Sequence, residues 1–103
     1  MSFDGTEGGQ ITSTVAAAMT KRYRKACPGQ TIAHFYGRDT IQALLDQDEC
    51  MGIRIYYGIK DDGSKELVLV GATADQNDML NLIMDISIRC PTDGCSTPNF
   101  LNS

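Results

Sequence analysis

Long hydrophobic runs are missing from this sequence of 103 residues. The longest, Leu67–Val70 extended by Gly71 and Ala72, is far shorter than the roughly 20 apolar residues that a transmembrane helix needs. This predicts no membrane span. The segment before Gln10 also lacks the basic start and the apolar stretch of a secretory signal. We therefore expect a cytoplasmic protein, unless it leaves the cell by a route that needs no signal.

Positive charge is scarce too. Nine lysines and arginines stand against thirteen aspartates and glutamates, which gives a net charge of −4. Nucleic-acid binding needs a basic surface that displaces counterions from phosphates, so the composition predicts no general nucleic-acid partner. One local exception is the basic run of Lys21, Arg22, Arg24 and Lys25. It either offsets the negative end of a helix dipole or docks an acidic partner or a phosphate.

Catalytic and nucleotide-binding patterns have little support in the sequence. A single histidine, His34, is present for four cysteines, and a Cys–His nucleophile needs the imidazole beside the thiol. No glycine loop follows a strand and precedes a lysine in the manner of a phosphate-binding loop. An enzyme is therefore the less favoured class, and a hydrolase or transferase that uses His34 is the form it would take.

The helical signals lie in the first half of the chain. After a flexible segment over residues 1–9, apolar residues recur every four positions at Ile11, Val15, Met19 and Tyr23. Thr12 or Ser13 would cap this helix and Pro28-Gly29 would end it. Residues 31–36 are either extended or lead into the next helix. Asp39 and Gln42 have the spacing of a capping box, which predicts a second helix of about two turns.

A β-hairpin is the clearest feature of the sequence. Strand-like alternation runs from Met51 to Ile59, a turn sequence follows with Gly63 free to take a positive φ, and residues 66–72 return as a second strand. This second strand is apolar on both faces, which predicts cover on both sides, by helices or by another subunit. Residues 79–88 fit a helix or a strand, and we favour a strand because the alternation is nearly complete.

Two adjacent tyrosines in the hairpin are candidates for an interface. Tyr56 and Tyr57 point to opposite faces of a strand, so we expect at least one of them to pack in the core. The other, beside Arg54, is a candidate anchor, since tyrosine and arginine are enriched at binding hot spots. Arg22 and Lys25 of the basic run are further interface candidates.

The cysteines leave three alternatives open. Cys90 and Cys95 have four residues between them, which suits a disulfide or half of a zinc site, and Cys50 with His34 would complete the zinc ligands. Ordinary reduced thiols are the third alternative. Cys50 comes directly before the first hairpin strand, and Cys90 follows the last apolar segment. Both would then lie at the same end of the sheet, where a bridge could close the domain.

Several motifs together resemble a family of small uncharacterised bacterial proteins. The resemblance covers Tyr23 to the C-terminus and rests on the CMGIRIYYG run, the LVLVG run, Asn77-Asp78, Cys90-Pro91, Cys95 and the ending 99–103. It implies that Cys50, Cys90 and Cys95 share a role and that Cys27 is incidental. It implies no activity, substrate or cofactor.

These features predict one α+β domain over residues 1–103: two N-terminal helices, then a small antiparallel sheet centred on the hairpin, then an irregular C-terminal arm over 90–103. The function we expect is non-enzymatic interaction or self-assembly, with a protein partner or a second copy of the chain. The alternative is a small metal- or redox-linked cysteine protein, with zinc or a disulfide at its cysteines.

Overall fold

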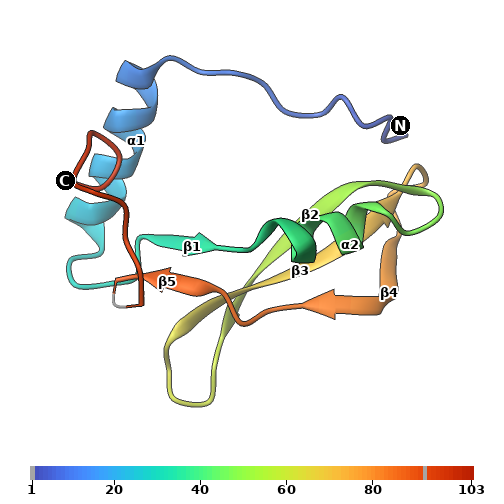
Figure 1. Ribbon diagram of the computed structural model, residues 1–103. Coiled ribbons are helices and arrows are strands. Elements are labelled where there is room, and N and C mark those ends of the chain that lie inside the picture. Colours follow the sequence, from blue (N-terminus) through green and yellow to red (C-terminus); the bar gives the residue numbers. More distant parts are fainter. Residues whose placement is uncertain (1, 92) are drawn as a thin grey trace. The chain divides into compact units, whose positions relative to one another are not determined.

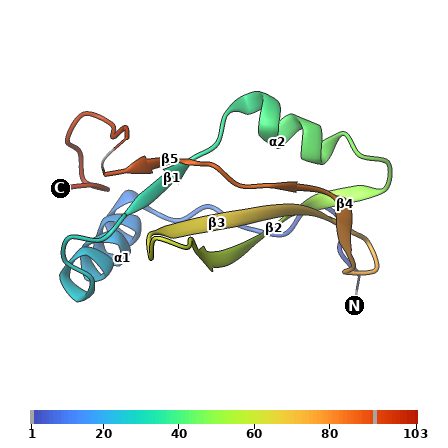
Figure 2. The ribbon, with the colours of Figure 1, turned by 90° about the horizontal axis from the view of Figure 1, so that it is seen from below.

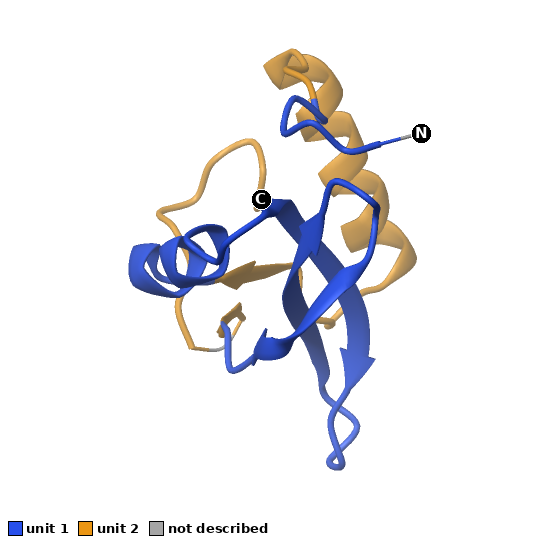
Figure 3. Cartoon of the chain, turned by 90° about the vertical axis from the view of Figure 1, so that its right-hand side faces the viewer, with its two compact units in different colours: residues 1–8, 36–87 blue, residues 9–35, 88–103 orange. Residues whose placement is uncertain are grey.

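The computed structural model describes residues 2–91 and 93–103 and has an α+β fold with antiparallel strands, as expected (Figure 1). The chain forms two compact units, each built from separate stretches. The first holds residues 2–8 and 36–87, and the second holds residues 9–35, 88–91 and 93–103 (Figure 3). The expectation of a single domain stays a prediction.

The first unit contains a three-stranded antiparallel sheet in the order β2-β3-β4. Its strands are β2 (Cys50–Ile59), β3 (Lys65–Thr73) and β4 (Asp78–Met84). β2 and β3 form the expected hairpin, in a register that pairs Ile59 with Lys65. In the turn, Gly63 has φ +86° and its N–H donates to the Lys60 carbonyl at 2.9 Å. The predicted need for glycine is therefore confirmed.

Helix α2 (Arg38–Leu45) provides cover for this hairpin, with contacts to both β2 and β3 (Figure 2). Leu44 on this helix is 0% exposed. The helix has the predicted length, but the capping box is wrong. Its N-cap is Gly37, and Gln42 donates to the Asp46 carboxylate at 2.7 Å, one turn further on.

The central strand β3 carries most of the core. Leu69, Val70 and Ala72 are buried on it, and these residues include both faces of the strand. The burial of residues on both faces agrees with the prediction of a strand covered on both sides, and α2 contacts β3. A second copy is not required to bury β3.

The ambiguous segment after residue 78 is extended, as the alternation favoured. β4 pairs with β3 at Gly71–Met79 and at Val70–Ile83, with a shift of register between the two pairs. The strand ends at Met84, and Ile86 beyond it takes φ +56°. β4 bends along its length in Figure 1.

The second unit contains helix α1 (Ser13–Ala26) and a two-stranded sheet of β1 (Ala33–Phe35) and β5 (Ile88–Cys90). Thr12 caps α1 by accepting the Val15 N–H at 3.2 Å, as predicted. No residue of the helix is buried. The segment 31–36, left open by the sequence, thus contains a strand between the two helices. The expected order of two helices followed by one sheet is wrong, because this strand pairs with residues 88–90 in a sheet of its own.

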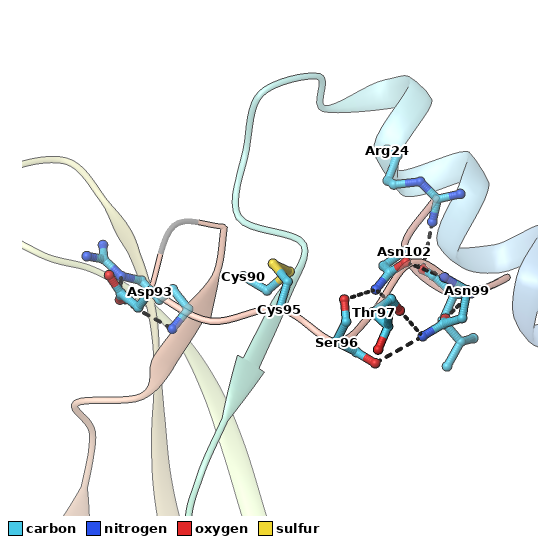
Figure 4. Close-up of a disulfide and its surroundings, with 10 residues drawn as sticks. Arg24, Cys90, Asp93, Cys95, Ser96, Thr97, Asn99 and Asn102 are labelled. Atoms are coloured by element: carbon cyan, nitrogen blue, oxygen red, sulfur yellow. Dashed lines mark hydrogen bonds and ion pairs between the residues drawn. A yellow bond between two sulfur atoms is a disulfide. The ribbon is translucent and has the colours of Figure 1, made fainter.

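The C-terminal arm has little regular structure, as expected, but it is held by many hydrogen bonds. Asn99 and Asn102 bond each other and the neighbouring backbone, and Arg24 of α1 donates to the Leu101 carbonyl at 2.7 Å (Figure 4). The glycine-rich N-terminal segment, expected to be flexible, is held at Phe3, whose N–H donates to the Ala74 carbonyl at 2.9 Å.

A candidate interaction surface on the hairpin

Strand β2 lies at the edge of its sheet. In the described part of the chain it pairs with β3 alone, and no strand pairs with its other side. An edge strand presents a row of backbone donors and acceptors to any chain that can pair with it. At ten residues, β2 is also the longest strand of the structure within residues 2–91 and 93–103.

The hairpin turn determines which backbone groups lie on this open side. The Lys60 N–H donates to the Ser64 carbonyl at 2.9 Å, so these two residues form a hydrogen-bonded pair. In an antiparallel ladder hydrogen-bonded and non-hydrogen-bonded pairs alternate. Counting back along the register, Gly58, Tyr56 and Arg54 direct their backbone groups toward β3. The backbone groups of Ile53, Ile55, Tyr57 and Ile59 point away from it, and we call these groups the β2 edge.

Large apolar side chains accompany this edge. Tyr57 is 95% exposed, Ile59 is 75% exposed and Ile55 is 54% exposed. We call these three side chains the apolar strip. Tyr56 is also exposed, so the expectation that one of the two tyrosines packs in the core is wrong.

The opposite face of β2 is engaged within the unit. Arg54 Nη1 lies 2.5 Å from Asp78 Oδ1, and the Tyr56 hydroxyl donates to the other oxygen of the same carboxylate. Asp78 is on β4, so both side chains reach across the central strand β3. The Arg54 guanidinium also lies over the Phe3 ring, 5.4 Å from its centroid, a cation–π contact. Arg54 and Tyr56 therefore help to cover β3, in addition to their predicted role as interface candidates.

This cluster shifts the ionisation of its members. The hydrogen bonds from Tyr56 and then from Arg54 lower the pKa of Asp78 below its ordinary value of 3.8. The bond to Asp78 raises the pKa of the Tyr56 hydroxyl, with burial as the second cause. At neutral pH the cluster thus holds an ionised carboxylate and a neutral phenol, so the charge of Arg54 is compensated inside the sheet.

A pocket of about 460 Å³ adjoins the cluster in the same unit. Phe3, Glu7 and Arg54 line it together with the first half of β2. The Glu7 carboxylate accepts from the N–H groups of Asp4 and Gly5, both at 3.0 Å. It stabilises the turn that places the N-terminal segment beside β2.

Sequence reasoning missed a buried carboxylate on β3. Glu66 is 4% exposed and accepts from the Ser87 hydroxyl at 2.5 Å and from the Leu67 N–H at 3.0 Å. Tyr36 bonds it as well at 3.4 Å, and burial with the Glu66 charge raises the pKa of Tyr36 to about 12. Tyr36 and Ser87 are the first and last residues of the stretch 36–87. The hairpin prediction placed Glu66 in the second strand, but no sequence signal marked its partners.

The cysteine candidates are divided between the two units. Cys90 and Cys95 form a disulfide, while Cys50 and Cys27 are free. Cys50 is in the first unit and its thiol lies 3.2 Å from the Gly52 carbonyl. The expected bridge between Cys50 and Cys90 is therefore wrong, because Cys90 is bonded to Cys95. Among residues 2–91 and 93–103, no three His, Cys, Asp or Glu side chains come together in a way that could hold a metal ion.

His34 is in the same unit as the disulfide. His34, Cys90 and Cys95 all line a pocket of about 630 Å³ in the second unit, with Asn99 and Asn102 of the arm. His34 pairs with Arg89 in the β1–β5 ladder. Of the four candidate disulfide or metal residues, the structure thus brings together three.

The basic run lies in the second half of α1, where positive charge complements the helix dipole. Arg24 is used within the unit, through its bond to the Leu101 carbonyl. Arg22 and Lys25, the two interface candidates, are exposed.

No helix in the described part of the chain is long and apolar enough to cross a membrane. Comparisons with family models, curated proteins and solved structures found no match. The resemblance to a family of small bacterial proteins therefore stays a prediction.

Proposed function

We propose that this protein is a non-enzymatic interaction protein that binds its partner by adding a strand to the β2 edge. The observation that carries the proposal is the coincidence of an unpaired ten-residue edge strand with the exposed apolar strip of Ile55, Tyr57 and Ile59. Backbone hydrogen bonds give affinity in this mode of binding, and alternate side chains give specificity.

Natural edge strands are usually protected from such pairing by lysine, proline, bulges or inward-pointing charges. Between residues 53 and 59 the sole charge is Arg54, which is compensated by Asp78. The register shift at residues 50–52 and Lys60 lie at the two ends of this stretch. The middle of β2 is thus left without these protections, which supports a role in binding.

The test is the effect of a lysine in the apolar strip on association. Tyr57→Lys should weaken self-association or partner binding by about tenfold or more, because a lysine on an edge strand disfavours the pairing of a further strand. Leu80→Lys is the matched control, since Leu80 is an exposed apolar residue on β4 of the same unit. Sedimentation equilibrium over a wide concentration range gives the affinity. Equal loss in both variants would contradict a specific role of β2.

A second candidate is the redox-linked cysteine protein. The Cys90–Cys95 disulfide and the presence of His34 in the wall of the same pocket favour it. Reduction of this bond would leave two thiols in the wall of the pocket that His34 also lines. Reduction and re-oxidation of this pair, followed by thiol titration, measure whether the bridge opens under mild conditions.

A further inference from the structure

We infer that the partner of β2 is a second copy of this chain, paired antiparallel about a two-fold axis at Tyr56. The inference rests on the proposed function and specifies its partner and register. In this register Ile55 pairs with Tyr57 of the second copy, and Ile53 pairs with Ile59 of the second copy. Two sheets of the order β2-β3-β4 then join into one continuous sheet.

The direction of the backbone groups restricts the choice of register. Hydrogen-bonded pairs between two copies must join residues of the β2 edge, all of which have odd numbers. A two-fold axis can therefore pass through a residue of β2 but not midway between two residues, and the three central positions are Ile55, Tyr56 and Tyr57. The axis at Tyr56 is the one that pairs all the residues of the β2 edge with one another, from 53 to 59.

The two neighbouring registers each leave part of the edge poorly paired. An axis at Ile55 places Ile59 opposite Met51, in the stretch where the β2 register shifts and where the Met51 carbonyl already lies close to Gly5. An axis at Tyr57 places Arg54 directly opposite Lys60 of the second copy, and like charges in that position destabilise a sheet.

The side chains agree with the axis at Tyr56. It places Arg54 opposite Gly58 of the second copy, so no charged pair is formed and space is left for the guanidinium. The two apolar strips come to lie on one face of the joined sheet, with Tyr57 beside Ile55 of the other copy. Tyr57, 95% exposed in the single chain, thereby gains a cross-strand apolar neighbour. Such a two-fold interface is the commonest form of homo-oligomer.

The test is disulfide cross-linking from single cysteines in a Cys27→Ser/Cys50→Ser background, which leaves the Cys90–Cys95 bridge in place. Tyr56→Cys should form a covalent dimer about tenfold faster than Ile55→Cys or Tyr57→Cys, because a residue on the axis faces its own copy at roughly 4.5–5.5 Å between Cα atoms. In the same register, two cysteines introduced at Ile55, or two introduced at Tyr57, lie on a diagonal, about 7–8 Å apart.

A double variant, Ile55→Cys/Tyr57→Cys, tests the register with Tyr56 intact, in case the Asp78 bond is needed for folding. It should cross-link faster than either single variant, because Ile55 of one copy pairs directly with Tyr57 of the other. Faster linking of Ile55→Cys or of Tyr57→Cys alone would overturn the register and leave the proposed function in place. A parent chain that sediments as a monomer at high concentration, with no covalent dimer from any variant, would overturn the second copy as partner. If the chain then bound no other partner either, the proposed function would be overturned as well.

Discussion

Two groups stabilise the charged side chain of Arg54, each by a different interaction. Asp78 supplies a charge-assisted hydrogen bond at 2.5 Å, and the Phe3 ring supplies a π face at 5.4 Å. Both partners come from other parts of the first unit, Asp78 from β4 and Phe3 from the N-terminal segment. A residue that sequence reasoning assigned to an interface thus has a structural role as well.

Replacement of Asp78 should change how stability depends on pH. The pKa of Asp78 is lower in the folded chain than its ordinary value of 3.8. Its contribution is therefore fully present above that value and is lost as the pH falls through the lower folded pKa. Asp78→Asn should reduce stability at pH 7 and make the decline between about pH 5 and pH 2 shallower. Urea unfolding at a series of pH values measures both effects.

The matched control for this change is Asp75→Asn. Asp75 is an exposed residue of the turn that precedes Asp78, so its replacement removes the same charge nearby. It should leave the pH dependence close to that of the parent chain. An identical profile for Asp78→Asn and the parent would show that the cluster with Arg54 and Tyr56 does not stabilise the charged carboxylate.

At the scale of elements, the sequence predicts those features that depend on residues close together in the chain. The β2–β3 hairpin, its turn glycine and the Thr12 cap of α1 all depend on neighbouring residues, and each is found in the structure. β1 is a three-residue strand whose partner β5 lies at the other end of the chain, beyond the whole first sheet. Nothing in the sequence of 33–35 specifies that pairing, so it could not be predicted.

The same limit applies to the candidate surface. Alternation correctly assigned Tyr56 and Tyr57 to opposite faces of β2, but neither is buried. Which face is covered depends on where α2 packs and on the reach of Arg54 to Asp78, and both are tertiary features. A period of two residues identifies a strand and leaves open which side faces the core.

Helix α2 should contribute to the stability of the hairpin mainly through Leu44. This side chain is 0% exposed, so Leu44→Ala leaves a cavity and should cost about 2–5 kcal/mol of unfolding free energy. Leu45→Ala is the matched control on the next residue, which is exposed, and should cost well under about 1 kcal/mol. Urea denaturation followed by circular dichroism gives both values. Similar losses in the two variants would contradict the packing of α2 through Leu44.

At the scale of the whole molecule, the cysteines show what composition leaves undecided. Four cysteines allow three complete pairings, and proximity to the ends of strands suggested Cys50 with Cys90. In the structure Cys90 is bonded to Cys95 instead, and Cys27 and Cys50 are free. Cys95 lies on the arm that folds back beside β5, and its sequence separation from Cys90 is only 5 residues. The fold of the arm, which carries no periodic pattern, decides the pairing.

Thiol titration tests this arrangement directly. In denaturant without reductant, the chain should show two reactive thiols, Cys27 and Cys50, and all four after reduction. Cys95→Ser should raise the first number to three, since Cys90 is released, and should lower stability by about 2 kcal/mol because the bridge closes a short loop. Cys27→Ser, the control, should lower the number to one, with the bridge intact. Four reactive thiols in the unreduced parent chain would contradict the disulfide and with it the redox-linked alternative.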